Sequence, residues 1–249
     1  MKAFAVVCVA AICGSSITTA QAITYNYSLN GTLAEDSGLG PSLVSYGGTF
    51  ASGGGYIFGK QQGLSLSGTG AYDSYSIDIR FYFNDVNVSP PVCCGPYQRI
   101  LDFENRVSDS GLYSYNGSLD LFASSYHPGD PHAISSSQVL YDNTLAALRV
   151  TRDSSGLFSA YLNGAFLFSV TDNTGSTKFS GPNNIIYFFI DDLETLFYYP
   201  NSPEAGTGYI DSISVTVNTP LPGALSLFGS GLGALGLLGW RRKKKAIAA

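Results

Sequence analysis

Apolar and polar residues alternate strictly between residues 74 and 83. The odd-numbered positions are large and apolar: Tyr75, Ile77, Ile79, Phe81 and Phe83. The even-numbered positions between them are mostly polar: Ser74, Ser76, Asp78, Arg80 and Tyr82. Successive side chains of a β-strand point to opposite faces of a sheet, so this period predicts a strand with one apolar face turned toward a core.

A β-hairpin is predicted at Asn163-Gly164. Apolar positions alternate from Leu157 to Leu162, and a second β-rich run follows from Ala165 to Val170. Asn-Gly between two such runs is a strong hairpin signal, because both residues accept the positive φ of a type I′ turn.

Further β-rich runs cover Asn184 to Ile190 and Gly208 to Val217, and turn-forming residues separate the runs. Between residues 23 and 220 no stretch keeps a helical period. Many short strands separated by turns predict an all-β fold with antiparallel sheets, arranged as a sandwich or a barrel.

The C-terminal end carries a different pattern. Residues 221–240 form an uncharged run of 20, which as a helix covers roughly 30 Å, the thickness of one bilayer core. Five cations follow directly and predict a stop-transfer sequence on the cytoplasmic side: Arg241, Arg242, Lys243, Lys244 and Lys245. We therefore expect one transmembrane helix, with the bulk of the chain outside the inner membrane.

The N-terminal end reads as a signal peptide. Lys2 is followed by an apolar stretch from Ala3 to Cys13, and Ala20 and Ala22 form a small-x-small cleavage site. The mature chain is expected to begin at Ile23. The predicted organisation is a signal peptide at 1–22, a β-domain at 23–217 and a C-terminal segment at 218–249.

The net charge of the predicted β-domain argues against a nucleic-acid partner. Lys2 and the five cations of the tail lie outside residues 23–220, so seven cations remain there against all 18 acids. Such an acidic domain repels the phosphates of nucleic acids, and we expect no nucleic-acid partner.

The tail resembles a bacterial PEP-CTERM sorting signal, in its Pro-Leu-Pro-Ala variant. The resemblance rests on a proline motif, an apolar span and a basic end in that order over about 30 residues; the motif positions are Pro220, Leu221, Pro222 and Gly223. Leu221 stands where the family name has glutamate, and Gly223 stands where the variant has alanine. The resemblance implies processing by an exosortase-type enzyme. It also implies anchoring in the inner membrane with the domain in the periplasm, followed by release to the cell surface or the exterior.

A second resemblance covers residues 42–217. Seven short pieces in order are similar to concanavalin A-like, laminin-G-like domains of bacterial surface proteins, and they occupy residues 77–83, 100–103, 109–113, 148–152, 160–164, 188–192 and 204–211. The resemblance implies an antiparallel two-sheet jelly-roll sandwich that binds glycan, protein or calcium in some members.

Calcium is the cofactor weighed for the acidic loops, with no cofactor as the alternative. Asp191 and Asp192 end a β-rich run, and Glu204 precedes the last one. Calcium binds carboxylate and carbonyl oxygens on irregular loops. The resemblance brings these two segments together at one corner, where they share either an ion or a hydrogen-bond network.

Other candidate chemistry is sparse. Cys93 and Cys94 are adjacent, and they form a vicinal disulfide, stay as two thiols or bond to another molecule. His127 and His132 flank Asp130 in a turn-rich loop. Two histidines and a carboxylate could bind a metal ion, but we interpret this segment as a structural loop rather than a metal site.

Two D-x-E pairs could serve a glycosidase, since residues i and i+2 share one face of a strand. They are Asp102 with Glu104 and Asp192 with Glu194. We interpret both as solvated acids at strand edges.

The sequence predicts an exported, non-enzymatic surface or matrix protein that binds or organises extracellular polysaccharide or contacts another surface protein. Two alternatives stay open: a glycan hydrolase or lyase on the same fold, and a plain membrane-anchored structural protein.

Overall fold

The computed structural model describes residues 21–87, 97–108, 110–122, 133–134, 137–179, 184–191 and 206–219. Residues Ala22–Asn218 form one compact unit. Every regular element in the described ranges is a β-strand, as the alternation predicts. No helix in these ranges is long and apolar enough to cross a membrane. The predicted transmembrane segment, the sorting motif from Pro220, the two adjacent cysteines and the two histidines lie outside them.

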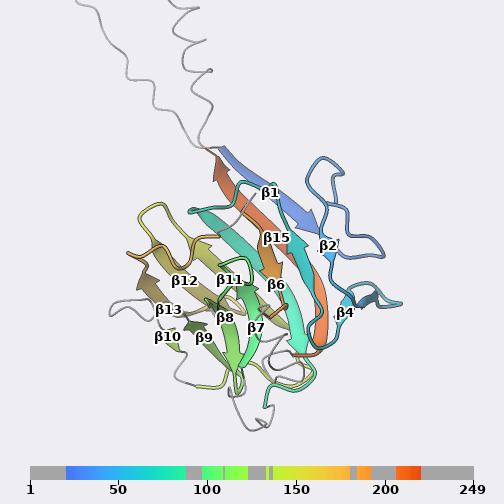
Figure 1. Ribbon diagram of the computed structural model, residues 1–249. Coiled ribbons are helices and arrows are strands. Elements are labelled where there is room, and N and C mark those ends of the chain that lie inside the picture. The colour runs from blue at the N-terminus through green and yellow to red at the C-terminus, as the bar shows by residue number, and fades with distance from the viewer. Residues whose placement is uncertain are drawn as a thin grey trace, which may run out of the picture. The chain divides into compact units, whose positions relative to one another are not determined.

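Two antiparallel sheets make up the domain and are consistent with a β-sandwich (Figure 1). The first sheet has eight strands in the order β13-β12-β11-β6-β15-β4-β3, with β1 also paired to β15. The second has seven, in the order β10-β9-β8-β7-β14-β5-β2. The strand bounds are β1 Gln21–Tyr27, β2 Val44–Ser45, β3 Thr49–Phe50, β4 Tyr56–Phe58, β5 Leu64–Leu66, β6 Tyr75–Phe83, β7 Tyr97–Asp102, β8 Gly111–Tyr115, β9 Ser118–Phe122, β10 Ala133–Ile134, β11 Ala146–Arg152, β12 Leu157–Leu162, β13 Ala165–Thr171, β14 Ile186–Phe188 and β15 Gly208–Thr219.

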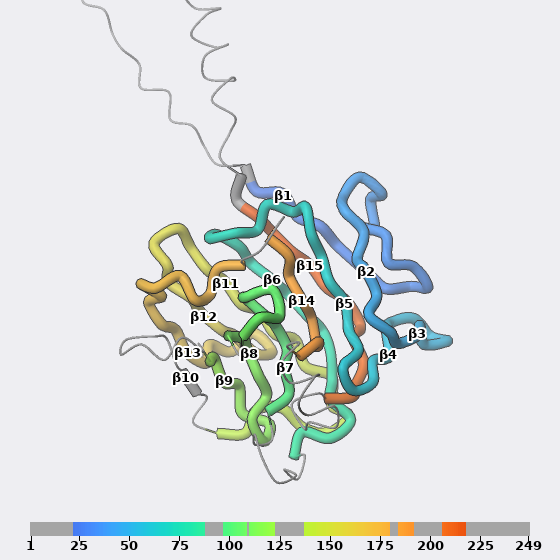
Figure 2. The backbone as a smooth tube through the Cα atoms, in the orientation of Figure 1, coloured from blue at the N-terminus to red at the C-terminus, as the bar shows by residue number. Residues whose placement is uncertain are grey.

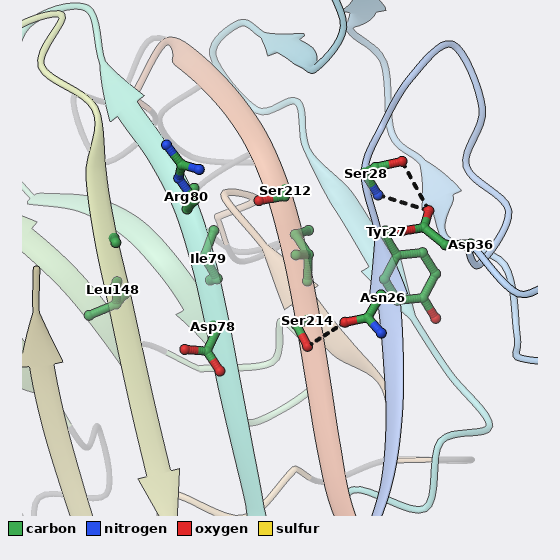
Figure 3. Close-up of a pocket in the computed structure, with 12 residues that line it drawn as sticks. Asn26, Tyr27, Ser28, Asp36, Asp78, Ile79, Arg80, Leu148, Ser212 and Ser214 are labelled. Carbon is green, nitrogen blue, oxygen red and sulfur yellow. Dashed lines mark hydrogen bonds between the residues drawn. The ribbon is translucent and has the colours of Figure 1, made fainter. Parts of the chain in front are cut away.

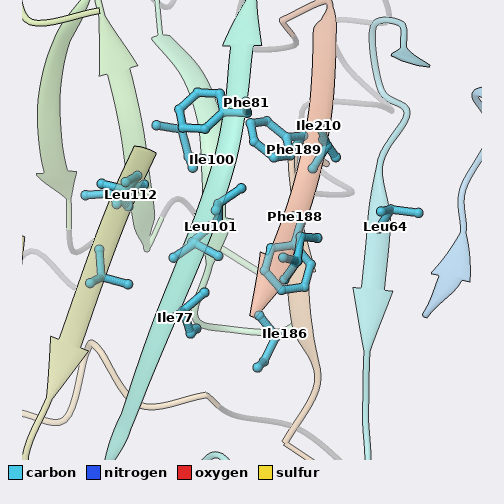
Figure 4. Close-up of a cluster of buried hydrophobic side chains, with 14 of the residues drawn as sticks. Leu64, Ile77, Phe81, Ile100, Leu101, Leu112, Ile186, Phe188, Phe189 and Ile210 are labelled. Atoms are coloured by element: carbon cyan, nitrogen blue, oxygen red, sulfur yellow. The ribbon is translucent and has the colours of Figure 1, made fainter. Parts of the chain in front are cut away.

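The core lies between the sheets, and β6 supplies the face that the alternation predicts. The side chains of all five odd-numbered residues from Tyr75 to Phe83 are buried. Figure 4 shows Ile77 and Phe81 of this strand beside Leu101 of β7 and Phe188 of β14. Burying one such side chain contributes roughly 1.5–3 kcal/mol, so the interleaved apolar faces hold the two sheets together.

The predicted hairpin is confirmed. β12 and β13 pair around Asn163 and Gly164, whose φ angles are 50° and 81°. Positive φ at both central residues is the requirement of the type I′ turn.

The strand predicted from Asn184 to Ile190 is shorter than expected, because β14 spans only Ile186–Phe188. Phe189 takes a left-handed φ of 63°, which is uncommon for a bulky residue and turns the chain out of the strand. Its amide donates to the carbonyl oxygen of Ile100 (3.1 Å), and its ring packs 4.6 Å from the Phe58 ring. Core packing therefore outweighs the local β-preference here.

The first and last strands lie side by side (Figure 2). The hydroxyls of Thr24 and Thr216 are 2.9 Å apart, and the Ser214 hydroxyl donates to Asn26 Oδ1 at 2.9 Å. These contacts set an antiparallel register between β1 and β15. The predicted signal cleavage after Ala22 falls inside β1, and cleavage there leaves residues 23–27 in the strand.

Candidate ligand-binding groove

The outward face of the first sheet is polar, because the alternation that buries one side of each strand turns the other toward solvent. On β6 the outward residues include Asp78 and Arg80. On β15, Ser212 and Ser214 alternate with the buried Ile213 and its neighbours. The same chain pattern that builds the core therefore builds this face.

Backbone register aligns these side chains into rows across the strands. Arg149 of β11 is opposite Asp78, and Asp78 is opposite Ser214. On the other side, Arg149 is opposite Tyr161, and Tyr161 is opposite Phe166. Together with Asn26, these residues form what we term the central row: Phe166, Tyr161, Arg149, Asp78, Ser214 and Asn26.

Side-chain contacts link the central row internally. Arg149 Nε lies 2.6 Å from Asp78 Oδ1, and Ser214 donates to Asn26. Figure 3 shows Asp78, Ser214 and Asn26 projecting from three neighbouring strands. At the far end, the Tyr161 and Phe166 rings meet edge to face at 5.5 Å, and Phe166 is 57% exposed. The row thus joins hydrogen-bonding groups to an accessible aromatic surface.

A β-bulge adds one more carboxylate to this face. The register between β15 and β6 shifts between Ile210 and Ser212, which makes Asp211 an extra residue. Asp211 Oδ2 lies 3.5 Å from Arg80 Nε. Bulges commonly redirect side chains next to functional sites, and this one brings a carboxylate to Arg80.

Two adjoining hollows lie over the row, with volumes of about 420 and 520 Å³. Both are lined by Asp78 and Ala147, so we describe them as one groove. Its wall on the β1 side includes Asp36, whose Oδ1 accepts from the backbone amide and the hydroxyl of Ser28, both at 3.0 Å. Its other side includes Tyr161. Volumes of this size are typical of small-ligand sites.

A separate charged cluster lies on the second sheet, and its side chains are buried. Arg99 contacts the carboxylate of Asp102 and the hydroxyl of Tyr113, and its Nε lies 3.3 Å from Asp191 Oδ1. Burial raises the pKa of Asp102 to about 6, and the charge of Arg99 opposes this rise. The cluster is buried, and its contacts connect the end of β7 to Tyr113 of β8 and to Asp191 after β14.

Arg106 extends this cluster toward the surface. Its amide donates to Asp102 Oδ1 (2.9 Å), and its Nε donates to the carbonyl oxygen of Asp191 (2.7 Å). The guanidinium lies 5.7 Å from the Tyr46 ring centre and 5.8 Å from that of Tyr187. Burial and the neighbouring Tyr46 raise the pKa of Tyr187 to about 12.

The predicted acid pair Asp102 and Glu104 does not share a strand face. β7 ends at Asp102, and Glu104 lies in the following turn, where its carboxylate accepts from the Ser108 hydroxyl. Asp102 is fully buried against Arg99. The two acids therefore form no i, i+2 pair on one strand, because β7 ends two residues before Glu104. The interpretation of Asp102 as a solvated acid at a strand edge is wrong, since its side chain is fully buried.

Of the three residues considered for calcium, Asp191 is described, and Asp192 and Glu204 are outside the described ranges. Asp191 is buried in the ion pair with Arg99. Among the described residues, no group of three or more His, Cys, Asp or Glu side chains could hold a metal ion.

The groove could not be identified from the sequence. Asp78 and Arg80 were visible as polar positions of one strand, but their partners on β11 and β15 are far along the chain. Tyr161 and Phe166 flank the predicted Asn-Gly turn, and this aromatic pair was the one local signal available.

No protein-family model and no curated protein sequence matches the chain. Among solved structures, it is similar to the binding domain of botulinum neurotoxin serotype D (TM-score 0.55, 14% identity, covering 80% of this chain and 48% of that one). It is also similar to a botulinum neurotoxin type C structure from work on cell entry through two ganglioside molecules (TM-score 0.53, 16% identity, 84% and 51% covered). A third is the serotype D ligand-binding domain in complex with N-acetylneuraminic acid (TM-score 0.54, 14% identity, 80% and 48% covered). The chain thus spans about half the length of these proteins, and at such identities the likeness shows a shared β-sandwich fold.

Proposed function

We propose that this protein is a carbohydrate-binding surface or matrix protein and that the groove on the first sheet is its glycan site. The observation that carries the proposal is the central row. It places a guanidinium, a carboxylate, a hydroxyl and an amide in line, with Tyr161 and Phe166 at one end. Sugar hydroxyls both donate and accept hydrogen bonds, and the apolar face of a sugar ring packs on aromatic rings.

The similar structures support carbohydrate as the general class of ligand, and not the charge of the sugar. Two of the neurotoxin structures concern gangliosides and N-acetylneuraminic acid. The low identity carries no residue over to this chain, so the site is argued from its own groove. Within the β-sandwich class, we propose a concanavalin A-like jelly roll, since the two antiparallel sheets agree with that fold.

Location completes the proposal. The signal-peptide pattern ending at Ala22 supports export, and the proline motif with its apolar span and basic end supports sorting by an exosortase-type enzyme. The domain then works at the cell surface or outside the cell, with extracellular polysaccharide or another surface protein as partner. The inner membrane holds the chain until processing.

A glycan-binding screen with matched variants tests the proposal. Residues 23–219 are passed over an array that holds neutral and anionic polysaccharides. Arg149→Ala and Phe166→Ala should each weaken binding about tenfold or more, equivalent to about 1.4 kcal/mol. Lys60→Ala removes an exposed cation elsewhere, and Tyr141→Ala removes an exposed ring elsewhere, so both should bind normally. Binding to no glycan, or equal binding by all four variants, would overturn the proposal.

A further inference from the structure

We infer that the groove selects uncharged glycan chains and excludes anionic ones, an inference that rests on the proposed function. It follows from the way charges on this face are paired, from the length of the central row and from the small side chains of the floor.

The charges in and beside the groove come in opposed pairs. Arg149 is paired with Asp78 and Arg80 with Asp211, while Asp36 adds one more negative charge. These five groups therefore sum to a small negative charge. An anionic sugar acid therefore experiences no net electrostatic attraction to this surface. The acidic domain as a whole also repels it.

The ion pairs remain available to a ligand because they are partly exposed. The Arg149 and Asp78 side chains are 59% and 36% exposed, and an exposed pair of this kind contributes at most about 1 kcal/mol to stability. The pair engages Nε of Arg149, and the terminal nitrogens of the guanidinium add further donors. A guanidinium beside a carboxylate offers donors and acceptors together, which suits the hydroxyls of a neutral sugar.

The central row is long enough for several sugar units. It crosses six strands, from β13 to β1, and neighbouring strands lie about 4.8 Å apart, so it extends roughly 24 Å. The two hollows meet at Asp78 and Ala147 in the middle of the row. A continuous chain, and not a single terminal sugar, matches this length.

The floor is lined by short side chains. Ala147, Ser212 and Ser214 let a flat chain approach the sheet, and the serines present hydroxyls. At the β13 end, the exposed ring of Phe166 provides an uncharged stacking surface. Both features favour contact with the hydroxyls and ring faces of neutral sugars.

Calorimetric titration with defined oligosaccharides tests this inference. The probes are neutral glucose oligomers of increasing length in several linkages, and polygalacturonate oligomers of matched lengths as anionic partners. We expect a neutral series to bind with affinity that rises with length and changes less than about threefold when salt is raised. The anionic series should bind at least about tenfold more weakly.

A variant that adds a positive charge to the groove sharpens the test. Ser212→Lys places a cation in the groove, and it should raise affinity for the anionic oligomers, while Ser52→Lys, in the exposed β3–β4 turn, should not. If anionic oligomers bind the unmodified protein better and Arg149→Ala still abolishes that binding, the selectivity is wrong but the glycan site stands. If Arg149→Ala and Phe166→Ala leave all glycan binding unchanged, the proposed site fails and this inference fails with it.

Discussion

Arg99 and Asp102 lie on the same face of β7, although three residues along a regular strand would put them on opposite faces. A register shift between Arg99 and Leu101 makes Ile100 an extra residue opposite β8. The bulge turns both charged side chains to the face that points away from the apolar core. Their direct contact is therefore a product of the bulge.

Removing Arg99 is expected to destabilise the fold strongly. Arg99→Met leaves Asp102 and Asp191 buried without this partner, and breaking a buried pair in this way costs about 3–5 kcal/mol. Arg149→Ala breaks the exposed pair with Asp78 and should cost under about 1 kcal/mol. Urea unfolding compares the two. Similar losses of unfolding free energy for both variants would contradict the assigned burial.

The stability of the protein should depend on pH through Asp102. Its folded pKa of about 6 lies above its unfolded value of about 3.9, because burial opposes the charged form. Its contribution to stability is therefore full below about pH 4 and is lost as pH rises through about 6. Asp102→Asn should remove this decline from the curve of unfolding free energy against pH.

Asp172 provides the control of opposite sign. Burial raises its pKa, but hydrogen bonds from Thr177 and the amide of Gly175 outweigh burial and lower it to about 2. Its contribution is present above about pH 4 and is lost as pH falls through about 2. Asp102→Asn should leave this acid limb unchanged. If the Asp102→Asn curve keeps its decline between pH 4 and 7, another group is responsible.

Two glycines should respond differently to alanine substitution. Gly164 has a φ of 81°, and a Cβ added there would contact no other atom. Gly164→Ala should therefore lower the free energy of unfolding only through backbone strain, by about 1–2 kcal/mol. At Gly63 a Cβ would collide with the backbone oxygen of Phe188, which cannot rotate away. Gly63→Ala should therefore cost more than Gly164→Ala in thermal unfolding. The reverse order would show that β5 and β14 are packed less closely.

Local sequence patterns predicted those parts of the fold in which neighbours along the chain decide the structure. The alternation at Tyr75–Phe83 gave β6, and Asn163-Gly164 gave the β12–β13 turn. The bulges at Ile100 and Asp211 were not predictable, because each depends on pairing with a distant strand. The central row depends on the same long-range register, so its residues could be recognised one at a time as polar positions but not as a site.

The proposed export and sorting give a separate prediction about the two ends of the chain. Under the proposed cleavage after Ala22, Ile23 would be the first residue, within β1. Under the proposed sorting at the proline motif, Trp240 and the five cations that follow it would be removed. Intact-mass measurement of protein recovered from the cell surface checks both ends. A mature chain that still carries Trp240 and the basic residues would instead support a plain membrane anchor.

Backbone NMR during titration with a bound oligosaccharide locates the ligand most directly. The account predicts that amide signals of Asp78, Arg149, Ser212 and Ser214 shift together and saturate at one affinity. Signals of β7, β8 and β9, on the other sheet, should stay in place. Shifts confined to those three strands, with the groove residues unmoved, would contradict the assignment of the groove as the glycan site.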